Sequence, residues 1–123
     1  ARDDCAPAAS GQTMSESGHD SIVTVYATFG SDEEARRICR TVVEERLAAC
    51  ANIIGPCHSI YRWQGEIEEA GEVAPMFKTA ADKTETLVAR IAELHSYDVP
   101  AAVVWPIASA FPPYAEWVRE STR

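Results

Sequence analysis

The sequence contains no apolar segment long enough to cross a membrane. Uncharged, largely apolar runs such as residues 99–110 are interrupted by prolines and are shorter than the roughly 20 residues that a spanning helix requires. Basic residues are also scarce, because 11 Lys and Arg stand against 19 Asp and Glu, which gives a formal net charge of −8. A negative surface repels phosphate groups. We therefore expect neither a membrane protein nor a nucleic-acid-binding protein.

The usual sequence signatures of metal centres and catalytic sites are absent as well. The four cysteines, at positions 5, 39, 50 and 57, form no C-x-x-C pair and no zinc-finger spacing. The chain has no Gly-rich phosphate loop, no H-E-x-x-H and no G-x-S-x-G. We expect reduced, mostly buried thiols and a non-enzymatic protein. A nucleophilic pair made by Cys50 and His95 stays open, because distance along the chain says nothing about distance in space.

The chain divides into a tail and one domain. Residues 1–20 contain almost no large apolar side chain, so we expect a tail that buries too little surface to fold. The tail also lacks the basic start and apolar centre of a secretory signal. The remaining residues, 21–123, have the length of a single domain. These features favour a cytoplasmic protein.

Periodicity predicts six elements and a terminal helix. Gln64-Gly65 predicts a two-residue hairpin turn, and Ser31 with Glu34 forms a capping box at the first helix. In order, we expect a strand over 22–29, a helix over 32–48, strands over 51–63 and 66–80, a helix from Asp82 to about His95, a strand over 101–107 and a helix from Pro112. The order β-α-β-β-α-β is the split βαβ, ferredoxin-like α+β arrangement, with strand order 4-1-3-2.

The predicted hairpin is unusual in its length and in its breakers. Thirteen residues in each arm span about 43 Å, whereas a domain of about 100 residues is only about 30–35 Å across. The hairpin must therefore protrude, and its edges and apolar residues need a cover, for which another copy of the chain is the simplest candidate. Gly55-Pro56 and Gly71 predict bends or bulges. Pro75 would lie in an inner strand, so it should mark a bulge too.

Five segments resemble the CutA family, named for divalent-cation tolerance, in order and spacing. They are VEERLAACANII (43–54), SIYRWQGEIEE (59–69), FKTAAD (77–82), HSYDVPAAVVWPI (95–107) and YAEWV (114–118). The resemblance implies a ferredoxin-like subunit in a tight homotrimer, with the long hairpin wrapping its neighbours. It also relates the architecture to PII-like signalling trimers. It implies a cytoplasmic, non-enzymatic protein of divalent-metal tolerance.

His95 and Asp98 are the best candidates for metal ligands. They lie three residues apart where a helix meets a loop, so an imidazole and a carboxylate could converge on a weakly bound divalent ion such as Cu(II). Asp98 stands where the family more often has Glu, which shortens this ligand by one methylene. We expect His95 to be the principal ligand, assisted by Asp98 or Cys50. The structural alternative is that His95 caps helix carbonyls and Asp98 bonds loop amides, while Cys50 is a small buried residue.

Trp63, Lys78 and Tyr97 are candidates for a ligand-binding cleft. The resemblance places them at a cleft between subunits. A lysine among apolar strand residues is costly to bury unpaired, so Lys78 should pair with a carboxylate such as Asp98 or Glu116, or bind an anion. The alternative functions are therefore a signalling trimer that binds a small anionic ligand, or a structural scaffold that presents a surface to a partner protein.

Overall fold

The computed structural model describes residues 21–123, and the predicted tail, residues 1–20, lies outside the described residues. In chain order the elements are β1 (Ile22–Ala27), α1 (Asp32–Glu44), β2 (Cys50–Trp63), β3 (Glu66–Ala80), the 3₁₀ turn η2 (Ala81–Lys83), α2 (Thr84–Leu94), β4 (Ala102–Pro106) and α3 (Pro112–Ser121). No helix among residues 21–123 is long and apolar enough to span a membrane.

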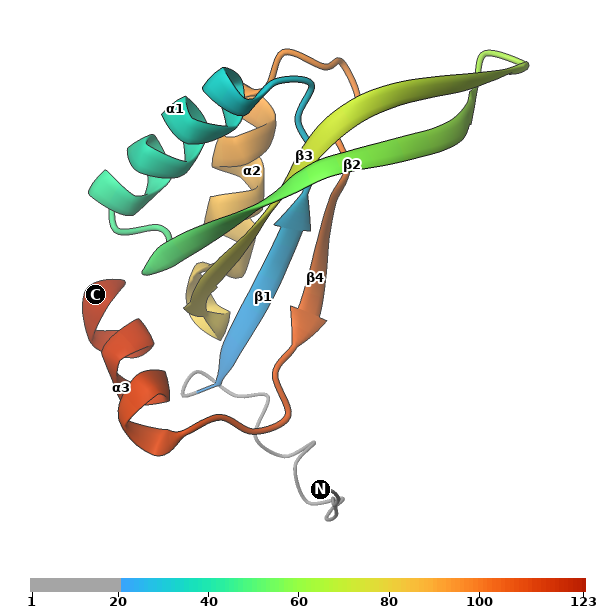
Figure 1. Ribbon diagram of the computed structural model, residues 1–123. Coiled ribbons are helices and arrows are strands. Elements are labelled where there is room, and N and C mark those ends of the chain that lie inside the picture. Colours follow the sequence, from blue (N-terminus) through green and yellow to red (C-terminus); the bar gives the residue numbers. More distant parts are fainter. Residues whose placement is uncertain (1–20) are drawn as a thin grey trace.

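The four strands form one antiparallel sheet in the order β2-β3-β1-β4 (Figure 1). This confirms the predicted ferredoxin-like α+β fold and its strand order. Helices α1 and α2 pack on one face of the sheet, where Ile38 and Leu87 meet Val25 and Phe77 in the main core. Burial of these alternate strand residues fixes which face of the sheet is inside.

Helix α1 begins where the sequence predicts and ends earlier. The Ser31 hydroxyl accepts a hydrogen bond from the Glu34 amide at 3.1 Å, as an N-cap does. The helix stops at Glu44 because Arg46 takes a left-handed conformation, with φ of 64°. The Arg46 amide bonds Val43 O and the Leu47 amide bonds Val42 O, which is a Schellman motif. The predicted end at residue 48 was wrong because this motif usually carries glycine, and here it carries arginine.

The β2–β3 hairpin closes through the predicted two-residue turn and extends well beyond the rest of the sheet (Figure 1). Gln64 and Gly65 both have positive φ, 52° and 84°, which is typical of a type I′ turn. The strands remain paired up to Trp63 and Glu66. The protrusion that strand length predicts is therefore present in the subunit.

The bulge in this hairpin lies at Gly55-Pro56 alone. The pairing register shifts between Ile54 and Cys57, so Gly55 and Pro56 together oppose Val73. A Cβ at position 55 would lie 2.8 Å from Val73 Cγ1, so glycine is required there. The bulges predicted at Gly71 and Pro75 are wrong, because Gly71 pairs regularly with His58 and Pro75 pairs regularly with Ile53.

Pro75 is tolerated in an inner strand because it interrupts only the pairing with β1. Phe29 and Val73 exchange two backbone hydrogen bonds, of 2.9 and 3.0 Å. The alternation of antiparallel pairs then directs the nitrogen of Pro75 toward β1, opposite Ala27. Pairing between β1 and β3 runs to Tyr26 and Met76 and resumes only at Phe29 and Val73. The missing N–H removes one rung there and leaves the β2–β3 register undisturbed.

The second face of the sheet, which we call the open face, is covered at one end only. There α3 packs Val118 against Ile22 and Ala49. Elsewhere the open face exposes large apolar side chains, namely Trp105 at 45%, Val103 at 46% and Ile54 at 51%. Trp105 stacks on Tyr26 with ring centroids 5.2 Å apart, and this packing leaves nearly half of its surface exposed. In the single subunit, this sheet therefore has a core on one face and an uncovered apolar surface on the other.

Candidate functional site

His95 occupies the C-cap of α2, at the start of the loop that leads to β4. Its side chain is fully buried, and its ring lies almost parallel to that of Phe29 at a centroid distance of 4.4 Å. Because the backbone leaves the helix here, with φ of −72° and ψ of 146°, the ring turns toward the end of β1. The loop and β1 are thereby connected through one imidazole.

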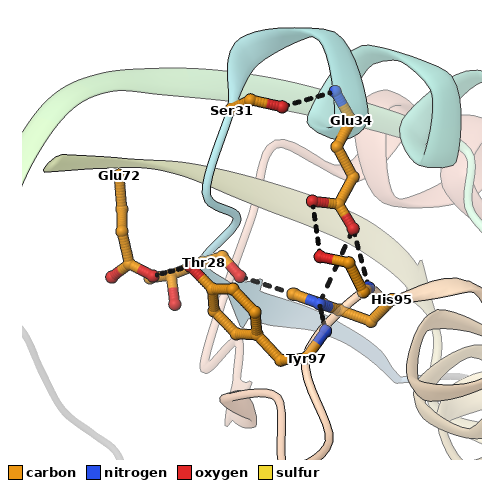
Figure 2. A network of polar contacts seen from close by, with 7 residues as sticks. Thr28, Ser31, Glu34, Glu72, His95 and Tyr97 are labelled. Atoms are coloured by element: carbon orange, nitrogen blue, oxygen red, sulfur yellow. Dashed lines mark hydrogen bonds and ion pairs between the residues drawn. The ribbon is translucent and has the colours of Figure 1, made fainter. Parts of the chain in front are cut away.

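Both ring nitrogens of His95 are engaged by backbone groups. Nε2 lies 2.8 Å from the carbonyl oxygen of Thr28, and the amide of Tyr97 lies 3.1 Å from Nδ1 (Figure 2). A carbonyl can only accept and an amide can only donate, so Nε2 donates to Thr28 and Nδ1 accepts from Tyr97. A metal ion binds imidazole through an unprotonated nitrogen. The geometry gives His95 a structural role, because neither nitrogen has a free lone pair, but the ring bonds the Thr28 carbonyl and not the helix carbonyls that the structural alternative predicts.

Glu34 fastens the same loop from α1. Its two carboxylate oxygens accept hydrogen bonds from the amide and the hydroxyl of Ser96, at 2.8 and 3.0 Å (Figure 2). The return bond of a capping box, from the Ser31 amide, was predicted for this carboxylate, which instead bonds Ser96 across 62 residues of chain. Helix α1 thus helps to hold the loop in place.

Glu72 is a buried carboxylate on β3, 9% exposed. It accepts hydrogen bonds from the Ser59 hydroxyl at 2.6 Å and from the Tyr97 hydroxyl at 2.7 Å. Figure 2 shows the Tyr97 ring reaching from the loop to Glu72. Burial raises the pKa of Tyr97, and the hydrogen bond to Glu72 raises it further. No Lys, Arg or His within residues 21–123 forms an ion pair with Glu72.

These groups border a cavity of about 530 Å³ beside the hairpin, which we call the hairpin cavity. Its walls come from β1, from both arms of the hairpin and from the loop before β4. They are formed by Tyr26, Thr28, Ser59, Tyr61, Trp63, Glu72, Tyr97, Asp98, Val99 and Ala101. The lining contains two carboxylates and four aromatic side chains, and no basic side chain. Its volume lies in the range of pockets that bind small molecules.

The hairpin cavity brings together three of the predicted residues. Tyr97 and Asp98 line it from the loop, and Trp63, 44% exposed, lines it near the hairpin turn. Lys78 does not line it, since it is six positions from Glu72 along β3, or about 20 Å. The expected pairing of Lys78 with Asp98 or Glu116 is not seen, as no ion pair joins Lys78 to a described residue.

Cys50 lies with Lys78 and not with His95 or Asp98. It pairs with Lys78 in the sheet, and its Sγ is 3.5 Å from the hydroxyl of Tyr114 on α3. Burial, and then the hydrogen bond to Cys50, raises the pKa of Tyr114 to about 12. Within residues 21–123 no group of three or more His, Cys, Asp or Glu side chains is arranged to hold a metal ion. The residues of a single subunit therefore do not fit a complete metal centre.

Glu34, Ser59 and Glu72 are the site residues that sequence reasoning missed. On β3 the even positions 66, 68 and 72 all carry Glu, yet Glu66 and Glu68 are exposed whereas Glu72 is buried. The alternation of strand residues predicts the shared face and cannot tell these three apart. Glu72 differs in being contacted by Ser59 of β2 and by Tyr97 of the loop before β4.

The comparison of the whole chain with known proteins identifies its family. The sequence profile of the CutA1 divalent ion tolerance proteins matches residues 23–121. The chain belongs to the CutA1 family. The resemblance that the sequence segments carry is thereby confirmed.

Relatives from distant organisms support this membership. The divalent-cation tolerance protein CutA of Thermus thermophilus is 46% identical over 98 residues, which are 80% of this chain and 95% of the relative. The mouse protein CutA is 38% identical over 102 residues, which are 83% of this chain and 58% of the relative. The chain thus spans somewhat more than half of the length of its mouse relative and nearly all of its bacterial one.

Solved CutA structures share the fold. The divalent cation tolerance protein CutA1 of Thermus thermophilus superposes with a TM-score of 0.80 at 44% identity, covering 83% of this chain and 99% of that one. CutA of Xylella fastidiosa gives a TM-score of 0.82 at 31% identity, covering 84% of this chain and 99% of that one. The CutA1 fold and the family's link to divalent-cation tolerance therefore apply to this chain.

Proposed function

We propose that this protein acts in divalent-cation tolerance as a homotrimer. The observation that carries the proposal is the open face of the sheet, which exposes Trp105, Val103 and Ile54 beside a protruding hairpin. Large exposed apolar surfaces of this kind are covered in oligomers, and closed symmetric assemblies are the usual solution. The hairpin extends beyond its own sheet and can reach the neighbouring copies.

Sedimentation equilibrium of the full chain tests the assembly. The expected mass is about three times the 13.4 kDa of one chain. Trp105→Glu places a charge on the open face and should shift the equilibrium toward monomer. Val43→Glu is the matched control, because Val43 is 36% exposed on α1, on the opposite side of the sheet. A monomeric wild-type protein at micromolar concentration would contradict the proposal.

We further propose that divalent ions, Cu(II) among them, bind weakly and reversibly, with Asp98 as the principal protein ligand. Asp98 is exposed and forms no ion pair with another described residue, whereas both nitrogens of His95 are engaged. Since one subunit offers too few ligands, water or groups of a neighbouring copy such as Cys50 would complete the coordination. His95 then positions the loop that carries Asp98.

Calorimetric titration with copper tests this assignment. The full chain with Cys5→Ser and His19→Ala removes two adventitious ligands of the tail. Asp98→Asn should weaken binding by about tenfold, and Asp82→Asn, an exposed acid near the start of α2, should leave it unchanged. Unchanged binding in Asp98→Asn would overturn the assignment to Asp98, and loss of binding in His95→Asn alongside it would favour His95 as the direct ligand.

We propose that the protein is non-enzymatic and that it is cytoplasmic. Cys39, Cys50 and Cys57 are free thiols, which suits a reducing compartment. The names of two relatives give other locations, chloroplastic for the protein of Arabidopsis thaliana and periplasmic for that of Archaeoglobus fulgidus. Rapid alkylation of Cys50 in the folded protein at neutral pH would indicate an activated thiol and contradict the non-enzymatic role. Fractionation of the source cells tests the location.

A further inference from the structure

The carboxylate of Glu72 is buried and is paired only with neutral groups. Its two protein partners are the hydroxyls of Ser59 and Tyr97, at 2.6 and 2.7 Å. Buried charges in proteins are normally paired with an opposite charge or with a metal. Two hydroxyl donors orient the carboxylate, and no basic side chain of residues 21–123 pairs with it. A cation in the hairpin cavity would therefore be a suitable partner for this carboxylate.

The charged side chains that line the hairpin cavity also favour a cation. Glu72 and Asp98 both line it, and no Lys, Arg or His does. Lys78, which was considered as the partner of an anionic ligand, pairs with Cys50 and lies well away from the cavity. Two carboxylates beside low-dielectric walls attract cations and repel anions. An anionic metabolite is thus the wrong chemistry for this cavity.

The shape and walls of the hairpin cavity indicate an organic cation and not a bare ion. Ser59, Tyr61 and Trp63 alternate along the same side of β2 and all line the cavity, so it extends for about 13 Å along the strand. Tyr26 and Tyr97 add aromatic surface to the cavity, and the Tyr97 hydroxyl bonds Glu72. Aromatic walls favour cations and apolar chains alike. A ligand that fits both Glu72 and the aromatic walls has a positively charged head and an apolar tail.

We propose that the hairpin cavity binds a small primary amine in its ammonium form. The ammonium head lies against Glu72 and the hydroxyl oxygens beside it, and the apolar tail runs along Tyr61 toward Trp63. A primary ammonium offers three N–H donors, which suits a carboxylate with unused lone pairs flanked by hydroxyl oxygens. This inference rests on Glu72 and the aromatic walls, and it does not depend on copper binding at Asp98.

Three probes with one tail and different charges test the proposal by calorimetry on the full-length assembled protein. They are hexylammonium, hexan-1-ol and hexanoate. Hexylammonium should saturate at one molecule per subunit and bind at least about tenfold more tightly than hexan-1-ol, which supplies the same tail without the charge. Hexanoate should bind more weakly than the alcohol. Equal binding of amine and alcohol, or tighter binding of hexanoate, would overturn the proposal.

Two variants locate the binding in the hairpin cavity. Glu72→Gln keeps the size of the side chain and removes its charge, and it should reduce hexylammonium affinity by about tenfold. Tyr61→Leu removes one aromatic wall without touching the bonds of Glu72, and it should weaken binding about threefold or more. Glu69→Gln is the matched control for charge, because Glu69 is exposed on the same hairpin and pairs with His58. Glu69→Gln should leave the affinity unchanged.

The outcomes separate this proposal from the trimer and from copper binding. If a neighbouring copy fills the hairpin cavity, the assembled protein will show no saturable hexylammonium binding, and the proposal fails while the trimer stands. If Asp98→Asn abolishes copper binding and hexylammonium still binds through Glu72, the two sites are distinct. Unchanged hexylammonium affinity in Glu72→Gln would overturn the proposal irrespective of the copper result.

Discussion

The imidazole of His95 lies nearly parallel to the ring of Phe29, with centroids 4.4 Å apart and an angle of 10° between their planes. Phe29 is itself fully buried in the main core. The residue that looked from the sequence like an ion ligand is thus packed on the core, with its nitrogens joining β1 to the loop after α2. This packing indicates that the main role of His95 is to stabilise the folded subunit.

Replacement of His95 should therefore destabilise the subunit. His95→Ala leaves the Thr28 carbonyl and the Tyr97 amide without their partner and opens a cavity, so we expect the free energy of unfolding to fall by about 2–4 kcal/mol. Urea unfolding at matched protein concentration measures it. His58→Ala is the control, because His58 is exposed on the hairpin, and it should change stability by about 0.5 kcal/mol or less. Equal effects of the two substitutions would contradict the structural role.

Glu34 should contribute to stability through the loop and not through the helix dipole alone. Glu34→Gln weakens two charge-assisted bonds to Ser96, so we expect a loss of about 1–2 kcal/mol. Glu33→Gln removes an exposed acid from the same first turn, and it should lose only a few tenths of a kcal/mol, about 0.3. Chemical unfolding of both variants gives the comparison. If the two losses match, the bonds to Ser96 contribute nothing measurable.

Gly55 and Gly71 should respond differently to the same substitution. A Cβ at Gly55 would meet Val73 Cγ1 at 2.8 Å and Val73 Cα at 3.2 Å, whereas nothing lies within 4 Å of a Cβ at Gly71. Gly55→Ala should therefore reduce the free energy of unfolding by about 1–3 kcal/mol. Gly71→Ala should be neutral or slightly stabilising, because it restricts the unfolded chain. Thermal unfolding of the pair decides the matter, and equal midpoints would argue against the bulge.

The thiol of Cys39 should weaken the protein in alkaline solution. Burial raises the pKa of Cys39 from its ordinary 9.0 to about 12. Above pH 9 the unfolded chain loses this proton while the folded chain keeps it, so stability falls as the pH rises. Between pH 9 and 10 the wild-type protein should lose about 1 kcal/mol more than Cys39→Ala does. Urea unfolding at several pH values measures the difference, and parallel pH profiles would contradict the burial of this thiol.

Much of the fold could be predicted because its signals are local. The alternation over residues 22–29, the Gln64-Gly65 turn and the cap at Ser31 each depend on a few neighbouring residues. The end of α1 could not be predicted, since Arg46 adopts the conformation that normally marks glycine. The bulge predicted at Pro75 was wrong because the pairing register, which the sequence does not reveal, decides which neighbouring strand the proline nitrogen faces.

The candidate site was harder to predict because its chemistry depends on partners far away in the chain. Tyr97, Asp98 and Trp63 were identified, and the structure places all three around one cavity. Glu72 was missed, since nothing near it in the sequence distinguishes it from exposed acids on the same strand. Lys78 was placed at the cleft by resemblance and Cys50 was proposed as a metal ligand for its thiol, and the sheet register pairs the two with each other.

The sequence by itself determined the order of the elements, the length of the hairpin and the family. Each of these follows from periodicity, from turn residues or from segments in a fixed order, which are properties of the chain and not of its packing. Only the tertiary structure decided which polar groups remain available for a ligand. His95 bonds a carbonyl 67 residues away and Tyr97 bonds a carboxylate 25 residues away. Whether a lone pair is used or free is set by such contacts, because hydrogen bonding and burial depend on what surrounds an atom in space.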